Sequence, residues 1–309
     1  MTNPLRISNS EVQTFKDCRR KWWLSYYRRL QPRQKDFTGA LALGSRIHEA
    51  LDRYYSKGIP LLDAHAQLVE EDKKILIENY RDTYDLESEA ELGRIMLEGY
   101  LQWVEENGID AELEMISTEE IIEMPLFDNR IVLQGKIDMR VRRRADGVRM
   151  FRDFKTVGGS FTDFGSIAHM NEQILTYMML ETAQNKEGER TEGGIFTMLK
   201  KVKRSANARP PFYDQIEVRH NVFTLRSFWQ RIHGVLTDLL HTRKVLDEGG
   251  DHRFIAYPRP SRDCKWKCQF FTLCPLFDDG SAAEQALGEM FEESDPYGYY
   301  NYEEKKGSE

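Results

Sequence analysis

Two short stretches hold acidic and basic side chains at spacings that could form a metal site. They read Gly135-Lys136-Ile137-Asp138 and Arg152-Asp153-Phe154-Lys155. A turn at Asp146-Gly147, between two alternating apolar segments, predicts a hairpin that brings Asp138 near Asp153 and Lys155. Residues two apart on a strand share a face, so Asp153 and Lys155 point the same way. The two carboxylates repel one another, and Mg²⁺ or Mn²⁺, which prefers hard oxygen ligands, would resolve that repulsion.

The lysine of this group has two readings. Beside a bound metal, Lys155 would stabilise charge developing on a phosphate or orient the attacking nucleophile. A pattern as short as Asp-x-Lys also arises by chance, and the same residues could then form a surface ion pair on an edge strand.

The cysteines form a second chemical group. The chain has four: Cys18, and then Cys264, Cys268 and Cys274 within one short segment. Four cysteines in 309 residues exclude a disulfide scaffold. The N-terminus lacks the apolar core of a signal peptide, so we expect a cytoplasmic protein, and no apolar run is long enough to cross a membrane. In a reducing compartment, clustered cysteines indicate metal or cluster ligands.

Charge is unevenly distributed along a chain of net charge -7. The segment 61–125 and the segment 276–309 are strongly acidic, whereas 16–35 and 136–155 are rich in lysine and arginine. A third basic group comprises Lys200, Lys201, Lys203, Arg204 and Arg209. Because local patches decide where a polyanion docks, three basic patches favour nucleic acid as a partner, although any one of them could be a solvated surface.

The elements that must position these residues follow from hydrophobic periodicity. Helices are predicted over 8–29, 41–55, 61–80, 88–107, 169–182 and 223–246, and strands over 119–126, 131–143, 148–156, 193–200 and 212–218. Ser8 and Glu11 have the spacing of a capping box at the first helix. The segment 251–275 is expected to be irregular, and the acidic tail 276–309 to be flexible. This order predicts an α/β fold with a mixed central sheet flanked by helices.

The motifs together resemble the PD-(D/E)XK nuclease superfamily. Gly135 and Asp138 match its G-x-x-D element, and Asp153 and Lys155 its D-x-K element. Gln173 and Tyr177, which would share a helix face, resemble the Q-x-x-x-Y motif of the RecB-like branch. Gly44 and His48 resemble the G-x-x-x-H element of that branch, in which the histidine is a metal ligand. The resemblance implies a restriction-endonuclease-like core in one nuclease domain over 1–275, with a helical part over 39–110 and a sheet core over 115–220.

The cysteines fit the iron–sulfur members of that branch, which include the CRISPR-associated exonuclease family and the AddB nuclease domain. There, one N-terminal and three C-terminal cysteines hold a 4Fe–4S cluster that joins the two ends of the domain. The resemblance implies that Cys18 and the three cysteines of the segment 251–275 hold such a cluster and join the two ends of the domain. The spacing C-x₃-C-x₅-C departs from the usual C-x₂-C-x₅-C. A four-thiolate zinc site and unligated thiols stay open as alternatives.

The resemblance implies a metal-dependent DNA exonuclease that acts in recombination, repair, or phage or CRISPR DNA processing. His48, Asp138, Asp153 and the main-chain carbonyl of Phe154 would hold Mg²⁺ or Mn²⁺, Lys155 would serve the attacking water, and Gln173 and Tyr177 would position the DNA strand. The expected substrate is single-stranded DNA or a duplex end, with a helicase, recombinase or integrase as a possible partner. The alternatives are an iron–sulfur DNA-binding subunit with a non-catalytic nuclease fold and a structural zinc protein.

The aromatic residues near Cys18 also have two readings. Trp22, Trp23, Tyr26 and Tyr27 stand among basic residues and could stack on unpaired bases. They could equally pack into a core beneath the cysteines.

Overall fold

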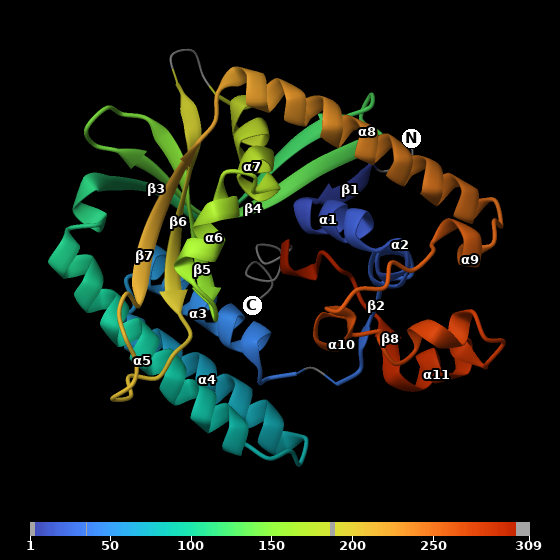
Figure 1. Cartoon of the computed structure of the whole chain (residues 1–309), viewed down its shortest axis with the longest axis horizontal. Coiled ribbons are helices and arrows are strands. Elements are labelled where there is room, and N and C mark those ends of the chain that lie inside the picture. Colours follow the sequence, from blue (N-terminus) through green and yellow to red (C-terminus); the bar gives the residue numbers. More distant parts are fainter. Residues whose placement is uncertain (1–3, 35, 186–188, 301–309) are drawn as a thin grey trace, which may run out of the picture. The chain divides into compact units, whose positions relative to one another are not determined.

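A computed structural model of the chain describes residues 4–34, 36–185 and 189–300. The chain divides into two compact units (Figure 1). Unit 1 comprises Met1–Lys35, Glu123–Gln134 and Arg226–Glu309, and unit 2 comprises Asp36–Ile122 and Gly135–Leu225. Each unit combines segments that lie far apart in the sequence.

Unit 2 holds three long helices and most of the sheet. Its elements are α3 (Ala40–Lys57), α4 (Leu61–Glu78), α5 (Tyr84–Asn107), the 3₁₀ turn η2 (Asp110–Glu112), β5 (Arg149–Val157), α6 (Phe161–Ala168), α7 (Glu172–Thr182), β6 (Thr191–Lys200) and β7 (Tyr213–Arg219). Strands β3 (Leu113–Leu126) and β4 (Ile131–Arg143) contribute residues to both units. These bounds lie close to the predicted ones, apart from β3, which was predicted over 119–126 and begins earlier, at Leu113, and α6, which the sequence did not indicate.

The sheet of unit 2 is mixed, as predicted. β5 runs antiparallel to β4 and parallel to β6, and β6 runs antiparallel to β7. In the β4–β5 pair, Met139 lies opposite Arg152. In the β5–β6 pair, Asp153 lies opposite Phe196 and Lys155 opposite Met198. The predicted turn at Asp146-Gly147 joins β4 to β5, and Gly147 has a positive φ of 72°, which suits glycine.

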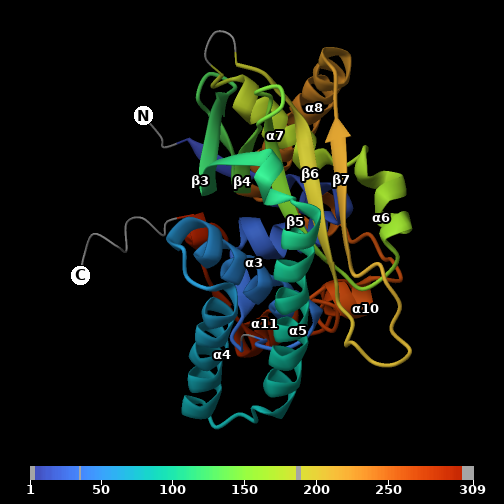
Figure 2. The same cartoon turned by 90° about the vertical axis from the view of Figure 1, so that its left-hand side faces the viewer.

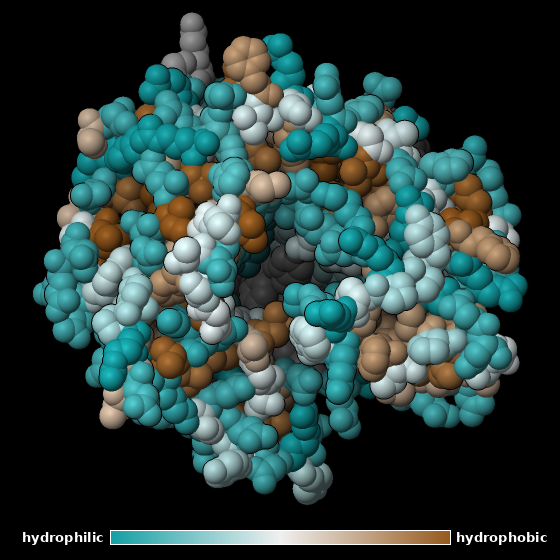
Figure 3. All heavy atoms as spheres, viewed as in Figure 1, coloured by the Kyte–Doolittle hydropathy of each residue, from teal (hydrophilic) through white to brown (hydrophobic). Residues whose placement is uncertain are grey.

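The helices α3, α4 and α5 pack together in unit 2, with α4 and α5 forming a hairpin (Figure 2). They share one core with β4, β5 and β6, and its buried members include Leu43, Ile47, Met96, Tyr100 and Phe154. Hydrophilic side chains dominate the outer edge of α5 (Figure 3), so the acidic residues of this helix are mostly a solvated face. At least one face of each helix is apolar, which is why the sequence periodicity predicted them.

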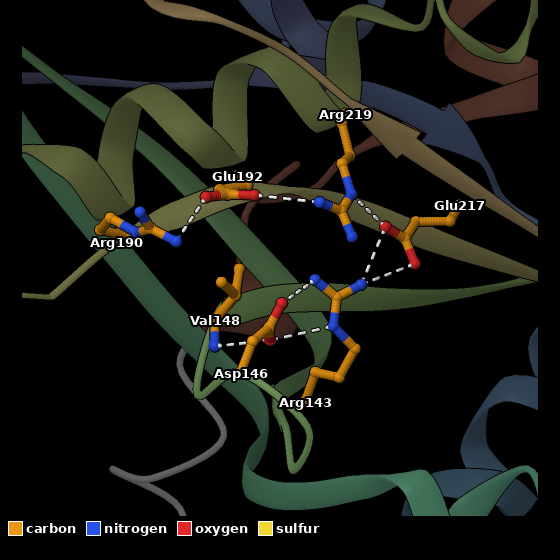
Figure 4. Close-up of polar contacts among 7 residues, drawn as sticks. All are labelled: Arg143, Asp146, Val148, Arg190, Glu192, Glu217 and Arg219. Carbon is orange, nitrogen blue, oxygen red and sulfur yellow. Dashed lines mark hydrogen bonds and ion pairs between the residues drawn. The ribbon is translucent and has the colours of Figure 1, made fainter.

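The basic stretch 136–155 is largely neutralised within unit 2. Its arginines pair with carboxylates, and at the β4–β5 turn Arg143 contacts both Asp146 and Glu217 (Figure 4). The row continues through Arg219 to Glu192 and Arg190. Alternating charges of this kind leave little field for a polyanion, so this patch does not carry the argument for nucleic acid that composition suggested.

Unit 1 is built from short elements and one long helix. They are β1 (Leu5–Ser8), α1 (Asn9–Asp17), α2 (Arg19–Trp22), the π-helix η1 (Trp23–Tyr27), β2 (Leu30–Pro32), α8 (Val222–Asp247, which begins in unit 2), α9 (His252–Ile255), α10 (Cys264–Lys267), the 3₁₀ turn η3 (Cys274–Phe277), α11 (Ala283–Met290), β8 (Phe291–Glu293) and the 3₁₀ turn η4 (Gly298–Tyr300). β1 pairs in parallel with the first residues of β4, from Leu5 opposite Ile131 to Ser8 opposite Gln134.

The first predicted helix is broken in the structure. The Ser8 side chain caps α1 by accepting from the backbone N–H of Glu11, as the capping-box spacing predicted. Cys18 then adopts an extended conformation, with φ -160° and ψ 111°, and this ends α1 and begins α2. Helical periodicity alone could not show this break, because the apolar spacing continues across it.

The stretch 276–300, which we expected to be flexible, is folded into unit 1. β8 pairs antiparallel with β2, and the Phe291 ring stacks on Phe270 with centroids 4.7 Å apart. Three of its acids pair with arginines of the stretch 16–35: Asp278 with Arg20, Glu284 with Arg28, and Glu292 with Arg33. The sequence expectation overlooked that these opposite charges could meet. Residues 301–309 lie outside the described part of the chain.

Candidate active site

The first half of the candidate site lies where α3, β4 and β5 meet in unit 2. One oxygen of the Asp138 carboxylate, Oδ2, accepts a hydrogen bond from the backbone N–H of Phe154 at 3.0 Å. The same oxygen lies 3.2 Å from Nδ1 of His48. The structure therefore brings together His48 from a helix and Asp138 from a strand, as the motif order predicted.

The second half lies on β5 and α7. The Lys155 ammonium lies 2.6 Å from Oδ2 of Asp153 and donates to Oε1 of Gln173 at 3.0 Å. The Gln173 amide also donates to Oδ1 of Asp153 at 2.9 Å. Gln173 thus links the carboxylate and the ammonium, and the Asn171 side chain caps α7 at the Gln173 N–H.

Tyr177 fixes α7 against β4. Its hydroxyl donates to the backbone carbonyl of Lys136 at 2.7 Å and accepts from the Gln173 amide at 3.0 Å. A Cβ at Gly135 would lie 2.8 Å from the Tyr177 ring, so the glycine of the G-x-x-D element permits this close approach. Gln173 and Tyr177 are thus neighbours on one helix face, as their spacing predicted.

The charges of the site interact strongly because they are removed from water. Burial raises the pKa of Asp153 to about 6. The Lys155 charge opposes this rise, and repulsion from the Asp138 carboxylate adds to it. For Asp138, burial also opposes ionisation, but the His48 and Lys155 charges outweigh it and lower the pKa. Burial alone would lower the pKa of Lys155, but the two aspartates raise it above its ordinary value. The site holds two carboxylates in different environments, which is a common arrangement in active sites.

A small pocket opens beside Asp138. About 10 Å³ of it can be entered by a water-sized sphere, which is room for about one water or one small cation. It is lined by His48, Leu51, Asp52, Tyr55, Thr118, Glu119, Asp138, Met139 and Phe154. Asp52 and Glu119 did not emerge from the sequence. Asp52 stands four residues after His48 and shares its helix face, which was an available signal, whereas nothing in the sequence marks Glu119.

The chemistry of these donors suits a divalent cation. One buried carboxylate, one half-buried carboxylate and an imidazole are hard or borderline ligands of the kind that bind Mg²⁺ or Mn²⁺. In this structure Asp138 faces His48 while Asp153 faces Lys155 and Gln173. No group of three or more His, Cys, Asp or Glu side chains within the described ranges is already close enough to hold a metal ion. The protein's own cations therefore balance the two carboxylates.

The four cysteines lie in unit 1, away from these residues in the sequence, and all are half-buried and free of disulfides. The sulfur of Cys18 accepts from the backbone N–H of Arg259 at 3.5 Å, and that of Cys264 from the N–H of Ser261 at 3.3 Å. Burial raises the pKa of Cys268, and negative charge on Cys18 and Cys264 raises it further. The three C-terminal cysteines and Cys18 thus come from separate segments into one region, but without a ligand group formed in the described residues.

The tryptophans near Cys18 are core residues. The Trp22 side chain is fully buried, and its Nε1 donates to Glu11 at 2.9 Å. Trp23 is 5% exposed and stacks on His252 with ring centroids 4.3 Å apart. These contacts decide between the two readings: Trp22 and Trp23 are not available to stack on bases.

A match to a protein family agrees with this geometry. A family model described as the PD-(D/E)XK nuclease superfamily matches residues 6–275. A solved structure titled "Crystal structure of SSO0001" is 16% identical, covers 86% of this chain and 94% of its own, and gives a TM-score of 0.31. No curated protein matches the chain. No helix in the described residues is both long and apolar enough to cross a membrane.

Proposed function

Because the chain belongs to the PD-(D/E)XK nuclease superfamily, we propose that it is a Mg²⁺- or Mn²⁺-dependent DNA exonuclease. The observation that carries this proposal is the pair of the half-buried Asp138 and the buried Asp153, with Lys155 held against the second carboxylate by Gln173. All motif residues of the site lie in unit 2. Such a group is costly to bury for stability alone, which favours a functional role.

The metal would be held by His48, Asp138, Asp153 and the main-chain carbonyl of Phe154. When bound, it supplies a Lewis acid that lowers the pKa of water and takes up charge on a phosphate. The Phe154 N–H orients the Asp138 carboxylate, and the Gln173 amide orients that of Asp153. These two hydrogen bonds fix both carboxylates before substrate arrives, which reduces reorganisation during the reaction.

Lys155 would act on the attacking water or the scissile phosphate. Its ammonium is restrained by two acceptors, Oδ2 of Asp153 and Oε1 of Gln173. The raised pKa of Lys155 keeps it charged at neutral pH, which suits stabilisation of negative charge more than proton removal. Tyr177 holds α7 in place through the Lys136 carbonyl, so Gln173 stays within reach of both partners.

Substrate phosphates have a second set of partners on β6 and the loop after it. Lys200 lies opposite Val157, on the same sheet face as Lys155 and further along the strand pair. No ion pair is formed within the described residues by Lys200, Lys201 or Lys203, unlike the arginines of 136–155. These free charges support DNA as substrate, as a single strand or a duplex end, in recombination, repair, or phage or CRISPR DNA processing. A helicase, recombinase or integrase would supply the end.

We also propose that Cys18, Cys264, Cys268 and Cys274 hold a 4Fe–4S cluster. The N–H groups directed at the sulfurs of Cys18 and Cys264 support ligation, because such bonds stabilise thiolates bound to metal. Arg20, two residues after Cys18, donates to the Cys274 carbonyl at 3.2 Å. This hydrogen bond links the segments that carry Cys18 and Cys274. The cluster would fix α10 and its flanking turns to the N-terminal segment within unit 1.

The nuclease proposal is tested with linear and circular DNA. End-labelled single-stranded and duplex oligonucleotides and circular single-stranded DNA are incubated with the protein and Mg²⁺, Mn²⁺ or EDTA. We expect products from linear DNA with either metal, none with EDTA, and intact circles. Efficient cleavage of circles would overturn the exonuclease assignment, and products in EDTA would overturn the metal dependence.

The cluster proposal is tested by metal analysis of protein purified without oxygen. We expect about four iron and four sulfide per chain, with absorbance near ~400 nm, both lost in Cys268→Ala. Stoichiometric zinc without iron would instead establish a four-thiolate zinc site. Neither metal would show that the thiols are unligated.

A further inference from the structure

The segment 252–271 of unit 1 displays an unusual number of aromatic rings to solvent. Phe254 is 78% exposed, Trp266 66%, Tyr257 49% and Phe271 44%. Four large rings left in water within one short segment are unfavourable for the isolated fold, because aromatic surface is normally buried. They differ in this respect from the buried Trp22 and Trp23.

The same segment carries positive charge that the protein does not neutralise. Arg259, Arg262 and Lys265 are exposed, and none forms an ion pair with the described residues. In contrast, Arg20 and Arg28 of the basic N-terminal stretch are paired with the acids of 276–300. The exposed rings of this segment therefore stand in sequence among three unpaired cations.

Contacts with α2 connect the parts of this surface. The Arg19 guanidinium lies 5.3 Å from the centre of the Tyr257 ring, and the Lys21 ammonium donates to the Lys267 carbonyl at 3.4 Å. Arg259 stands two residues after Tyr257, and its backbone N–H donates to the Cys18 sulfur. Tyr257, which follows α9, and Lys267, at the end of α10, thus both adjoin α2. We call Phe254, Tyr257, Trp266 and Phe271, with Arg259, Arg262 and Lys265, the aromatic–basic surface.

We propose that the aromatic–basic surface binds single-stranded DNA, with bases stacked on its rings and phosphates on its free cations. The proposal rests on the proposed nuclease function and adds a binding surface in unit 1, outside the candidate active site. Single strands expose their base faces, whereas a duplex hides them, so rings and cations together fit a single strand better than a duplex. A protein partner would need both an acidic and an apolar face to match the same residues.

The test measures binding separately from cleavage. Fluorescence anisotropy of a labelled oligo-dT strand is recorded in EDTA for wild type, Trp266→Ala and Phe254→Ala. Loss of one stacked base is worth roughly 1–3 kcal/mol, so we expect each variant to bind roughly 5- to 100-fold more weakly. Trp266→Tyr should restore most of the affinity. Tyr84→Ala is the matched control, because Tyr84 is 75% exposed but lies on the acidic α5 of unit 2.

The charge contribution is measured through its salt dependence. Arg262→Gln and Lys265→Gln should each reduce the slope of log Kd against log salt by about 0.7, the value for a single strand. Lys57→Gln, an exposed lysine of α3, should leave the slope unchanged. Thermal melts check that each variant folds, and Phe254→Ala tests the surface in α9, outside the stretch 264–274 that holds three of the cysteines.

The outcomes separate this proposal from the nuclease function. Wild-type affinity in both Trp266→Ala and Phe254→Ala would overturn the surface even if the protein cleaves DNA. Equal losses for a blunt duplex and for oligo-dT would overturn the single-strand assignment. If the wild type binds oligo-dT through these residues but cleaves nothing with Mg²⁺ or Mn²⁺, the surface stands and the nuclease proposal fails.

Discussion

At the scale of single residues, the site depends on a few side chains that hold one another. Asp153 touches both Lys155 and Gln173, and Gln173 touches Tyr177. Because these groups share hydrogen bonds, the removal of one should disturb the others, and their contributions should not be additive. The connected arrangement explains why a glutamine and a tyrosine on α7 accompany an aspartate and a lysine on β5.

A prediction at this scale concerns the Tyr177 hydroxyl. Tyr177→Phe leaves the Lys136 carbonyl and one Gln173 N–H without that partner, which costs about 1–3 kcal/mol. We expect cleavage to fall about tenfold, because Gln173 then holds Lys155 less firmly, with little change in DNA binding. Steady-state kinetics should show a lower kcat at similar KM. Tyr54→Phe, which removes a hydroxyl from α3, is the control, and equal effects in both variants would contradict this role.

The sequence could predict these residues because their spacing is tied to regular elements. Asp153 and Lys155 are two apart on a strand, and Gln173 and Tyr177 are four apart on a helix. Glu119 could not be predicted, because it enters the pocket from β3 with a positive φ of 50°, which no local pattern indicates for a glutamate. Asp52 was visible in principle, because it stands four residues after His48 on the same helix.

At the scale of elements, the α3–α4–α5 layer contains a buried histidine that the site does not use. His65 is 3% exposed on α4, and a Cβ at Gly93 of α5 would lie only 2.4 Å from its Nε2. Gly93 therefore allows the two helices to approach. Burial first, and then the Arg46 charge, lower the pKa of His65 to about 4.

This shift predicts how stability depends on pH. A histidine with a lowered folded-state pKa binds its proton more readily when unfolded, so stability is lost as the pH falls from about 6.5 to about 4. The loss is on the order of 3 kcal/mol at most, at 1.36 kcal/mol per pKa unit. In His65→Gln, urea unfolding should show a weaker fall over that range, whereas the exposed-site variant His169→Gln should follow wild type. Parallel curves for His65→Gln and wild type would contradict the assignment.

Element boundaries were predictable where apolar periodicity and turn residues agreed. Strand β4 and the Asp146-Gly147 turn illustrate this agreement. The break within the helix predicted over 8–29 could not be predicted. It depends on Cys18 and on contacts with residues near position 257, which are remote in sequence. Periodicity reports one face of an element and contains no information about such distant partners.

At the scale of the whole molecule, side-chain and strand contacts within unit 1 join the N-terminal stretch 5–33 to the stretch 276–300. Arg20 is 1% exposed and makes two hydrogen bonds to the Asp278 carboxylate, at 2.6 and 3.0 Å. Tyr297 donates to the buried Glu11, and β2 pairs with β8. Composition predicted a flexible acidic tail, because a charge count cannot show that three of its acids have arginine partners far away in the sequence.

A prediction at this scale concerns Asp278. Asp278→Asn leaves the buried Arg20 without its counter-charge, and breaking a buried pair costs about 3–5 kcal/mol, less here because Asp278 itself is about half exposed. We expect a clear fall in the melting temperature. Asp279→Asn, next to it and with a carboxylate that accepts from the Ser281 backbone N–H, should melt as wild type does. Equal melting of both variants would show that the ends are held by other contacts.

The most direct measurement of the central claim is Mg²⁺-dependent cleavage of linear single-stranded DNA by Asp153→Asn and Lys155→Ala, with oligo-dT binding in EDTA measured in parallel. The account predicts a loss of at least about 1,000-fold, or about 4 kcal/mol of barrier, with binding and melting near wild type. Asp163→Asn, on the neighbouring helix α6, should cleave normally. Cleavage within a few-fold of wild type in Asp153→Asn would contradict the proposed active site.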